Sequence, residues 1–145
     1  GLVVIPAVLL IADRSALQHV DYGLLMTFVC FFIFSGNMSR IEAVNHIISA
    51  LLAKNTLLVS IASCQFISNV PSAILLSEFT ENYRALLYGV NIGGTGTIIA
   101  SLASLITFRQ YCAAEPGGAK KYLLHFSAFN FAFLIIMTVI CYALL

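Results

Sequence analysis

Long apolar stretches separated by short polar connections run along the whole chain. The complete stretches that we expect to form transmembrane helices are residues 22–38, 85–108 and 122–145. A helix needs roughly 20 apolar residues to cross a bilayer. Residues 1–12 are apolar but too few to cross, so we interpret them as the end of a truncated transmembrane helix. The pattern predicts an all-α integral membrane protein.

Residues 39–55 have a different pattern. Apolar side chains such as Ile41, Val44 and Ile48 recur at helical spacing, and most polar side chains fall elsewhere. Such a segment is typical of an amphipathic helix that lies in the membrane interface. Ser39 followed three positions later by Glu42 fits a capping box, which predicts that the helix starts there.

A proline-containing break interrupts the apolar run at residues 56–77. Pro71 lacks a backbone donor and restricts the residue before it, so we expect the helix to break near Asn69 and Val70. Each arm of about ten residues reaches only about half-way across a bilayer core of about 30 Å. The lengths predict a re-entrant helical hairpin with a polar Ser68-Asn69 tip; a single proline-kinked span is the alternative.

A second break interrupts residues 85–108, where glycines and threonines alternate near the middle of the span. Three glycines within four positions favour unwinding, which frees backbone carbonyls. These carbonyls and the threonine hydroxyls would suit a hard cation such as Na⁺. The alternative is that the small residues allow close helix packing. The run lacks the Gly-Lys-Ser/Thr ending of a nucleotide-binding loop.

Composition narrows the class of protein. Hydrophobic residues make up 61% of the 145 residues and charged residues 9%, against roughly 25% charged in soluble domains. The net charge of +1 gives no basic field for nucleic acid. The four cysteines form no CxxC pair, so neither a disulfide nor a metal framework is expected. No Ser/His, paired-Asp or HExxH arrangement indicates an enzyme.

The distribution of basic residues gives an orientation for a multi-pass protein of the cell membrane. If the hairpin returns to its own side, the connections at 13–21 and 109–121 share one side and carry four basic residues. The other side carries Arg40, Lys54 and Arg84. Positive residues favour the cytoplasmic side, so the C-terminus is expected outside.

Two interrupted membrane segments close in sequence point to the substrate and ion sites of a secondary transporter. Helix N-termini at such breaks offer partial positive charge and free N–H groups to an anion. The spans lack acidic and basic residues in their cores, so a proton relay lacks candidates and Na⁺ is the expected coupling ion, with no other cofactor. The candidate substrate-binding residues are Ser68, Asn69, Val70, Pro71 and Thr97, and the candidate ion-binding residues are Ser68, Asn69, Asn91, Gly93, Gly94, Thr95 and Gly96.

The runs 64–76 and 89–101 resemble the C-terminal half of ion transporter superfamily permeases. That group includes citrate transporter-like proteins and divalent anion–sodium symporters, and is related to the arsenite and sodium–proton antiporter branch. The resemblance implies one half of an inverted-repeat transporter, working as a homodimer, in which a transport domain moves against a scaffold. It also implies that the partner half-site lies in an N-terminal repeat missing from this chain.

In sodium-coupled dicarboxylate members of that group, a Ser-Asn-Thr tip contacts the carboxylate and helps to frame a sodium site. Ser68 and Asn69 match the first two positions, whereas Val70 replaces the threonine and removes a hydroxyl. The run 93–97 corresponds to the second sodium-binding element. The resemblance thus implies transport of a small di- or tricarboxylate-like anion coupled to a cation gradient. The alternatives are an arsenite or sodium–proton antiporter-type permease and a non-transporting membrane scaffold subunit.

Overall fold

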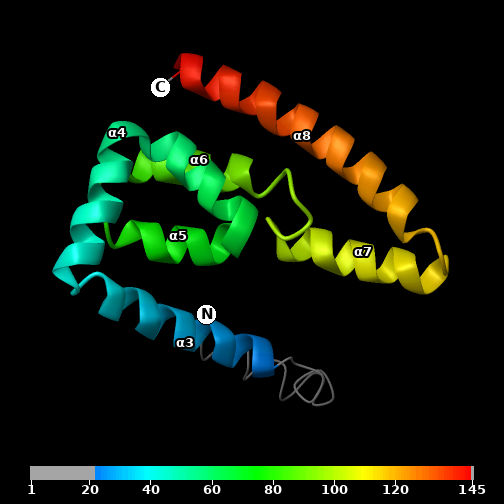
Figure 1. Ribbon diagram of the computed structural model, residues 1–145, viewed down its shortest axis with the longest axis horizontal. Helices are drawn as coiled ribbons and strands as arrows, with labels where there is room; N and C mark the ends of the chain where they lie inside the picture. The colour runs from blue at the N-terminus through cyan, green and yellow to red at the C-terminus, as the bar shows by residue number, and fades with distance from the viewer. Residues whose placement is uncertain (1–21, 145) are drawn as a thin grey trace, which may run out of the picture. The chain divides into compact units, whose positions relative to one another are not determined.

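The computed structural model describes residues 22–144, and every regular element in that range is an α-helix (Figure 1). The expected helix end at 1–12 and the connection at 13–21 lie outside the described residues. The helices are α3 (Tyr22–Met38), α4 (Glu42–Ile67), α5 (Asn69–Ser77), α6 (Tyr83–Gly93), α7 (Leu102–Ala114) and α8 (Ala119–Leu144).

The chain divides into two compact units, Gly1–Cys30 and Phe31–Leu145. In the first unit the structure describes the start of α3, where the Thr27 hydroxyl donates a hydrogen bond to the Gly23 carbonyl (2.9 Å). The second unit contains the rest of α3 and helices α4 to α8.

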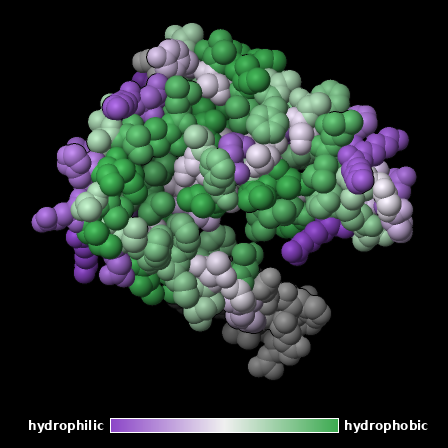
Figure 2. All heavy atoms as spheres, in the orientation of Figure 1, coloured by the Kyte–Doolittle hydropathy of each residue, from purple (hydrophilic) through white to green (hydrophobic). Residues whose placement is uncertain are grey.

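Helices α4 and α8 are each long and apolar enough to cross a membrane. None of the apolar window of α8 is buried, and side chains such as Leu124 and Phe129 are exposed. The face in Figure 2 is correspondingly mostly hydrophobic, with hydrophilic residues toward its edges. Exposed apolar surface on this scale is unusual for a water-soluble monomer and is expected of a helix that faces lipid. The structure of residues 22–144 thus fits a helical membrane protein.

Helix α4 bends sharply at Asn55, whose backbone is extended (φ −163°, ψ 91°). The Asn55 side-chain oxygen accepts a hydrogen bond from the Leu58 backbone N–H (2.9 Å), which is the geometry of an N-cap. Residues 56–67 therefore form a helical arm of their own. The bend falls at the boundary that we expected between the amphipathic segment at 39–55 and the hairpin at 56–77. The placement of these two segments in a membrane stays a prediction.

We expect Asn55→Ala to destabilise the protein by about 1 kcal/mol, because it leaves the first turn of this arm uncapped. Asn55→Ser keeps an oxygen that can cap and should recover most of the loss. The measurement is thermal unfolding of the full-length protein in detergent. Equal midpoints for wild type, Asn55→Ala and Asn55→Ser would show that the bend does not depend on the cap.

The predicted capping box at the start of α4 is wrong. The N-cap residue is Ile41, and no side chain caps the helix. The Ser39 hydroxyl instead donates to the Gly36 carbonyl (3.0 Å) near the end of α3. Because the polypeptide turns directly from α3 into α4, the Ser39 hydroxyl bonds to a carbonyl at the end of α3 rather than to an N–H at the start of α4.

The two arms of the hairpin, residues 56–67 and α5, are joined by a hydroxyl pair. Ser63 and Ser72 share a hydrogen bond of 2.9 Å, and Ser72 is fully buried. Helix α6 packs against the first arm through glycines. A Cβ at Gly89 would lie 2.6 Å from the Ser60 Cβ, and one at Gly93 would lie 2.9 Å from the Cys64 Cβ. Close helix packing, one of the two interpretations of the small residues, therefore applies to Gly93.

Several helix bounds differ from the sequence expectation. The discontinuous span expected at 85–108 begins at Tyr83, and its interruption lies between the end of α6 at Gly93 and the start of α7 at Leu102. Helix α7 continues to Ala114, six residues past the expected end, and α8 begins at Ala119, before the expected 122. The connection between α7 and α8 is correspondingly short, because polar residues such as Gln110 and Lys120 extend the two helices.

Candidate functional site

The first helix break lies at Ser68, one residue before the expected Asn69–Val70. Ser68 has φ 73° and ψ 158°, and it is the junction between α4 and α5. Pro71 is the third residue of α5. A proline is tolerated in the first turn of a helix, where its missing N–H is not needed. The chain therefore reverses upstream of the proline, and α5 starts with the proline already inside it.

The second break covers residues 94–101, later than the expected 91–97. Asn91 and Gly93 still belong to α6. Gly96 adopts φ 104°, where side chains are disfavoured, and its missing Cβ makes room for the Gln65 side-chain oxygen and for Leu134. The break extends past the glycines because the following backbone groups bond to the hairpin instead of to a helix.

These two breaks meet in space. The Asn69 backbone N–H donates to the Ala100 carbonyl (2.9 Å), and the Ser68 hydroxyl donates to the same carbonyl at 3.4 Å. A Cβ at Gly94 would lie 3.0 Å from the Asn69 side-chain nitrogen, so Gly94 leaves space for that side chain. Figure 1 accordingly places the α4–α5 junction beside the segment that leads into α7. We call this meeting point the junction site: Ser68, Asn69, Gly94, Ala100 and Ser101.

Gln65 holds the two breaks together, and the sequence analysis missed it. Its side-chain nitrogen donates to the carbonyls of Gly93 (2.8 Å) and Thr95 (3.1 Å), and its side-chain oxygen accepts from the Thr97 N–H (2.9 Å). The Thr97 hydroxyl also donates to the Gln65 backbone carbonyl (3.1 Å). The available signal was a glutamine inside an otherwise apolar arm, because a polar side chain there needs partners.

The start of α5 offers no free backbone donor to an anion, contrary to the sequence expectation. The Asn69 N–H is bonded to Ala100, and the Val70 N–H donates to the Asn69 side-chain oxygen (2.9 Å). Pro71 has no N–H, and the Ser72 N–H donates to the Ser68 carbonyl (3.1 Å). Groups of the hairpin and the Ala100 carbonyl of the second break therefore already occupy the N–H groups that an anion would need.

Two other sets of donors remain at the junction site. The Asn69 side-chain nitrogen donates no hydrogen bond to any residue in the described range, as the bonds of this side chain all use its oxygen. Helix α7 has Ser101 as its N-cap, in extended conformation and with no side-chain cap bond. The first N–H groups of a helix have no partners within it, and they carry its partial positive charge. No sequence motif marked Ser101 or the start of α7, because the glycine run predicts a break that ends before them.

The other candidate residues are distributed around this centre. Val70 is 45% exposed next to the tip. The Thr95 hydroxyl donates to the Ile92 carbonyl (2.6 Å), so its side chain is used within the break. The Asn91 side chain donates to the Leu87 carbonyl of its own helix (2.7 Å) and is not brought to the junction site.

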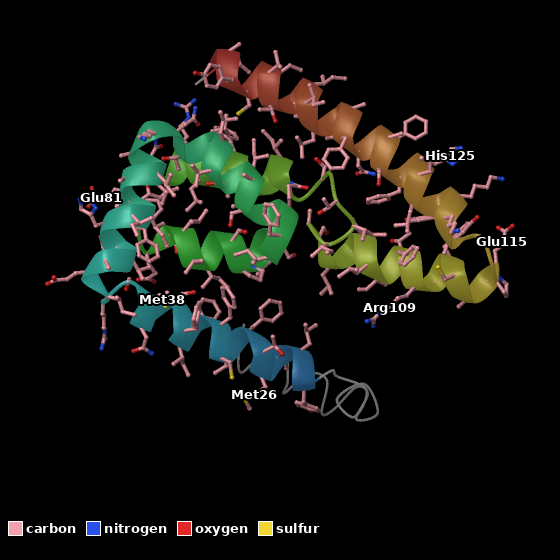
Figure 3. All side chains as sticks on the ribbon, in the orientation of Figure 1. Met26, Met38, Glu81, Arg109, Glu115 and His125 are labelled. Carbon is pink, nitrogen blue, oxygen red and sulfur yellow. The ribbon has the colours of Figure 1, made fainter. Side chains whose placement is uncertain are left out.

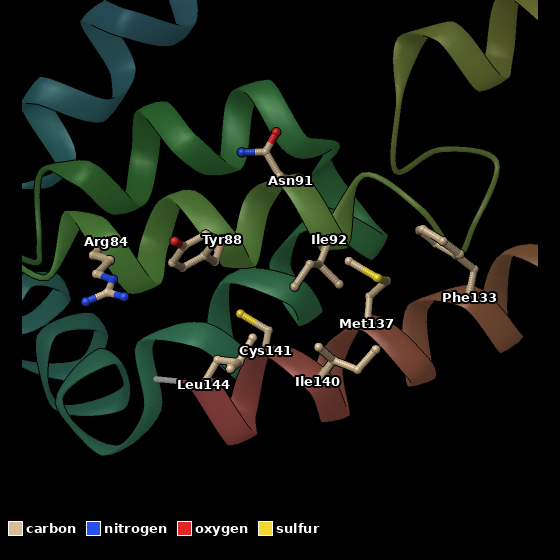
Figure 4. Close-up of a pocket in the computed structure, with 9 residues that line it drawn as sticks. All are labelled: Arg84, Tyr88, Asn91, Ile92, Phe133, Met137, Ile140, Cys141 and Leu144. Atoms are coloured by element: carbon tan, nitrogen blue, oxygen red, sulfur yellow. The ribbon is translucent and has the colours of Figure 1, made fainter.

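Asn91 instead lines a groove of about 520 Å³ between α6 and α8 (Figure 4). Apolar side chains of α8, among them Met137 and Ile140, form its other wall, and Arg84 lies at one end, with its guanidinium 5.9 Å from the Tyr88 ring. The groove therefore has a different chemistry from the junction site.

Ionisable side chains lie away from the junction site. Figure 3 shows Glu81 beside α4, Arg109 on α7, Glu115 at the α7–α8 turn and His125 on α8. At that turn the Tyr111 hydroxyl donates to the Glu115 carboxylate (2.9 Å), which raises the pKa of Tyr111. Residues 68–71 and 94–101 include no ionisable side chain. Within the described residues, no cluster of three His, Cys, Asp or Glu side chains could hold a metal ion. The junction site is therefore polar but uncharged.

Comparison with known proteins supplies two relatives. The chain is 42% identical over 108 residues to a Methanocaldococcus jannaschii protein named "Uncharacterized transporter MJ0456", a match that covers 73% of this chain. It is 34% identical over 113 residues to the Escherichia coli K12 "Inner membrane protein YbiR", which covers 76% of this chain. Similarity to these two proteins supports a membrane transporter-like protein.

Each match covers 30% of the relative's own length, so the chain spans about a third or less of the relatives it matches. No protein-family model and no solved structure matches the chain. The relatives' names and the apolar helices support a membrane location.

Proposed function

We propose that the chain is part of a secondary active transporter that moves a small anion coupled to a cation gradient. The observation that carries this proposal is the hydrogen bond between the Asn69 N–H and the Ala100 carbonyl, which joins two broken helices. Broken helices that meet are the usual construction of substrate and ion sites in secondary transporters. The transporter name of one relative supports the same class.

The anion would be held by neutral donors. The proposed donors are the Asn69 side-chain nitrogen and the first N–H groups of α7. The Ser68 hydroxyl would join them by exchanging its bond to the Ala100 carbonyl (3.4 Å) for one to the anion. A hydrogen bond from a neutral donor to an anion is weaker than one from a charged donor such as Arg or Lys. A transporter must release its substrate on the far side, and neutral donors suit that task. A di- or tricarboxylate-like anion fits this donor set, and Val70, Pro71 and Thr97 would shape its surroundings.

The coupling cation would be held by oxygen atoms, since the two breaks carry no ionisable side chain. We propose Na⁺ as this ion, with the Ser68 hydroxyl and the Asn69 side-chain oxygen as ligands from the tip. The remaining candidate ion-binding residues, from Asn91 to Gly96, stay a prediction. We further propose that an N-terminal repeat of the same protein supplies the other half of the site, and that two copies form a homodimer in the cell membrane with the C-terminus outside.

Two alternatives rest on specific observations. Val70 in place of a hydroxyl-bearing residue favours an arsenite or sodium–proton antiporter-type permease over a dicarboxylate symporter. The close contacts of Gly89 and Gly93 with α4 favour a membrane scaffold subunit, in which the small residues serve packing alone. Neither relative is named as an enzyme, and we propose no catalytic activity.

The test is uptake of labelled succinate and citrate by the full-length protein in proteoliposomes. An inward Na⁺ gradient is compared with an equal choline gradient. We expect uptake that requires Na⁺. Equal uptake in the two gradients would show that transport is not coupled to Na⁺. If neither anion enters, the same vesicles are tested for arsenite transport and sodium–proton exchange, and no movement of any of them would contradict the transporter class.

A further inference from the structure

Two carbonyl oxygens beside the second break and one of α4 surround the Gln65 side-chain nitrogen. The Gln65 side-chain nitrogen lies 2.8 Å from the Gly93 oxygen and 3.1 Å from the Thr95 oxygen. It also lies 3.2 Å from the Ile61 oxygen of its own helix. Partial negative charges gathered around one point repel each other unless a positive group lies between them.

The backbone determines which end of the Gln65 amide faces these carbonyls. The other end accepts a hydrogen bond from the Thr97 N–H (2.9 Å). A backbone N–H can only donate and a carbonyl can only accept, so the oxygen must face Thr97 and the nitrogen must face the carbonyls. Gly96 fits this arrangement, because a Cβ at this position would collide with the Gln65 side-chain oxygen.

We propose that the side-chain nitrogen of Gln65 stands where a cation would otherwise stand among the carbonyls of the second break. Unwound carbonyls at broken membrane helices commonly coordinate a coupling ion. Here the chain supplies the positive partner itself. The N–H group belongs to the Gln65 side chain, so it cannot dissociate as a bound cation can. The carbonyls of Gly93 and Thr95 are therefore structural, and a coupling cation would bind through the tip oxygens of Ser68 and Asn69 instead.

This proposal rests on the proposed function in one respect: it assumes that a coupling cation binds at the tip rather than among these carbonyls. The test measures stability and needs no transported solute, so the two can fail separately. Gln65→Glu keeps the shape of the side chain but places a carboxylate among the carbonyls. That carboxylate requires either a proton or a metal cation. Gln110→Glu is the matched control, because Gln110 is exposed on α7.

The experiment is the melting temperature of full-length wild type, Gln65→Glu and Gln110→Glu at pH 5 and pH 8, in NaCl or choline chloride. At pH 8 in choline we expect Gln65→Glu to melt roughly 5 °C or more below wild type. The deficit should shrink at pH 5, because the folded protein holds the proton more tightly than the unfolded chain and stability is lost as the pH rises. It should also shrink in NaCl, whereas Gln110→Glu follows wild type throughout.

A deficit of Gln65→Glu that is the same at both pH values and in both salts would overturn the proposal. A third variant, Gln65→Met, gives the effect of losing the hydrogen bonds alone. We expect its deficit to be independent of pH and of Na⁺. If Gln65→Glu does not accumulate in neutral medium, it is purified at pH 5, where the neutral carboxyl can donate. Failure to fold at pH 5 as well would also overturn the proposal.

Discussion

Asn69→Ala is expected to reduce transport by at least about tenfold while the full-length protein still accumulates in the membrane. The Asn69 side-chain nitrogen donates no hydrogen bond within the described residues, and the side-chain oxygen accepts from the Val70 N–H. A hydrogen bond to a charged ligand contributes about 1.5–3 kcal/mol, and about 1.4 kcal/mol is tenfold in affinity. The measurement is initial uptake in proteoliposomes, normalised to the amount of folded transporter.

Two further variants separate the local hydrogen bond of Asn69 from ligand binding. Asn69→Ser keeps an oxygen that can accept from the Val70 N–H but lacks the amide nitrogen, so it should recover stability and not transport. Asn130→Ala is the matched control, because Asn130 lies on α8 and donates to the Phe126 carbonyl of its own helix (2.9 Å). Uptake by Asn69→Ala at the wild-type rate would remove Asn69 from the substrate site.

Gly89→Ala is expected to destabilise the protein by about 2–3 kcal/mol, although it adds only one methyl group. That methyl would lie 2.6 Å from the Ser60 Cβ and 2.9 Å from the Leu57 backbone oxygen. Helix α6 would have to move away from α4, and overpacking of this kind costs about 1–3 kcal/mol. Thermal unfolding in detergent measures the effect.

Gly36→Ala provides the comparison within the same protein. Gly36 is also helical, but nothing lies within 4 Å of the position of its Cβ. Alanine is the better helix former by about 1 kcal/mol, so this variant should be neutral or slightly stabilised. Ser60→Gly should partly rescue Gly89→Ala, because it removes the atom that the new methyl meets. Equal stabilities of Gly89→Ala and Gly36→Ala would show that α6 and α4 are not in close contact at this position.

Local patterns predicted which segments are helical, although not all of the helix bounds. The apolar run at 22–38 has the same bounds as α3, and the polar Ser68-Asn69 pair marks the reversal between α4 and α5 to within one residue. These features depend on the local composition, which acts within a few residues. The proline does not itself cause the reversal, because Pro71 lies inside the first turn of α5. The capping box failed for a similar local reason, since Ser39 had a nearer partner in Gly36.

The contacts that build the junction site could not be obtained in this way. Gln65 bonds to Thr97, 32 positions along the chain, and Asn69 bonds to Ala100. Which carbonyl meets which donor depends on how the hairpin packs against α6, and the sequence does not specify that register. The glycine run indicated that the helix unwinds, but Gly93 serves packing and Gly96 makes room for Gln65. The same residue type has two roles that only the packing distinguishes.

A ligand site at Asn69 is tested most directly by asking whether ligands stabilise the full-length protein through the junction site. Melting temperatures of wild type and Asn69→Ala are measured with succinate, citrate, sulfate and arsenite, each in NaCl. A ligand that binds only the folded state raises the melting temperature. The account predicts that at least one anion raises the melting temperature of wild type by several degrees and leaves Asn69→Ala unchanged. No shift with any of them, or an equal shift in both proteins, would contradict a ligand site at Asn69 and favour the scaffold alternative.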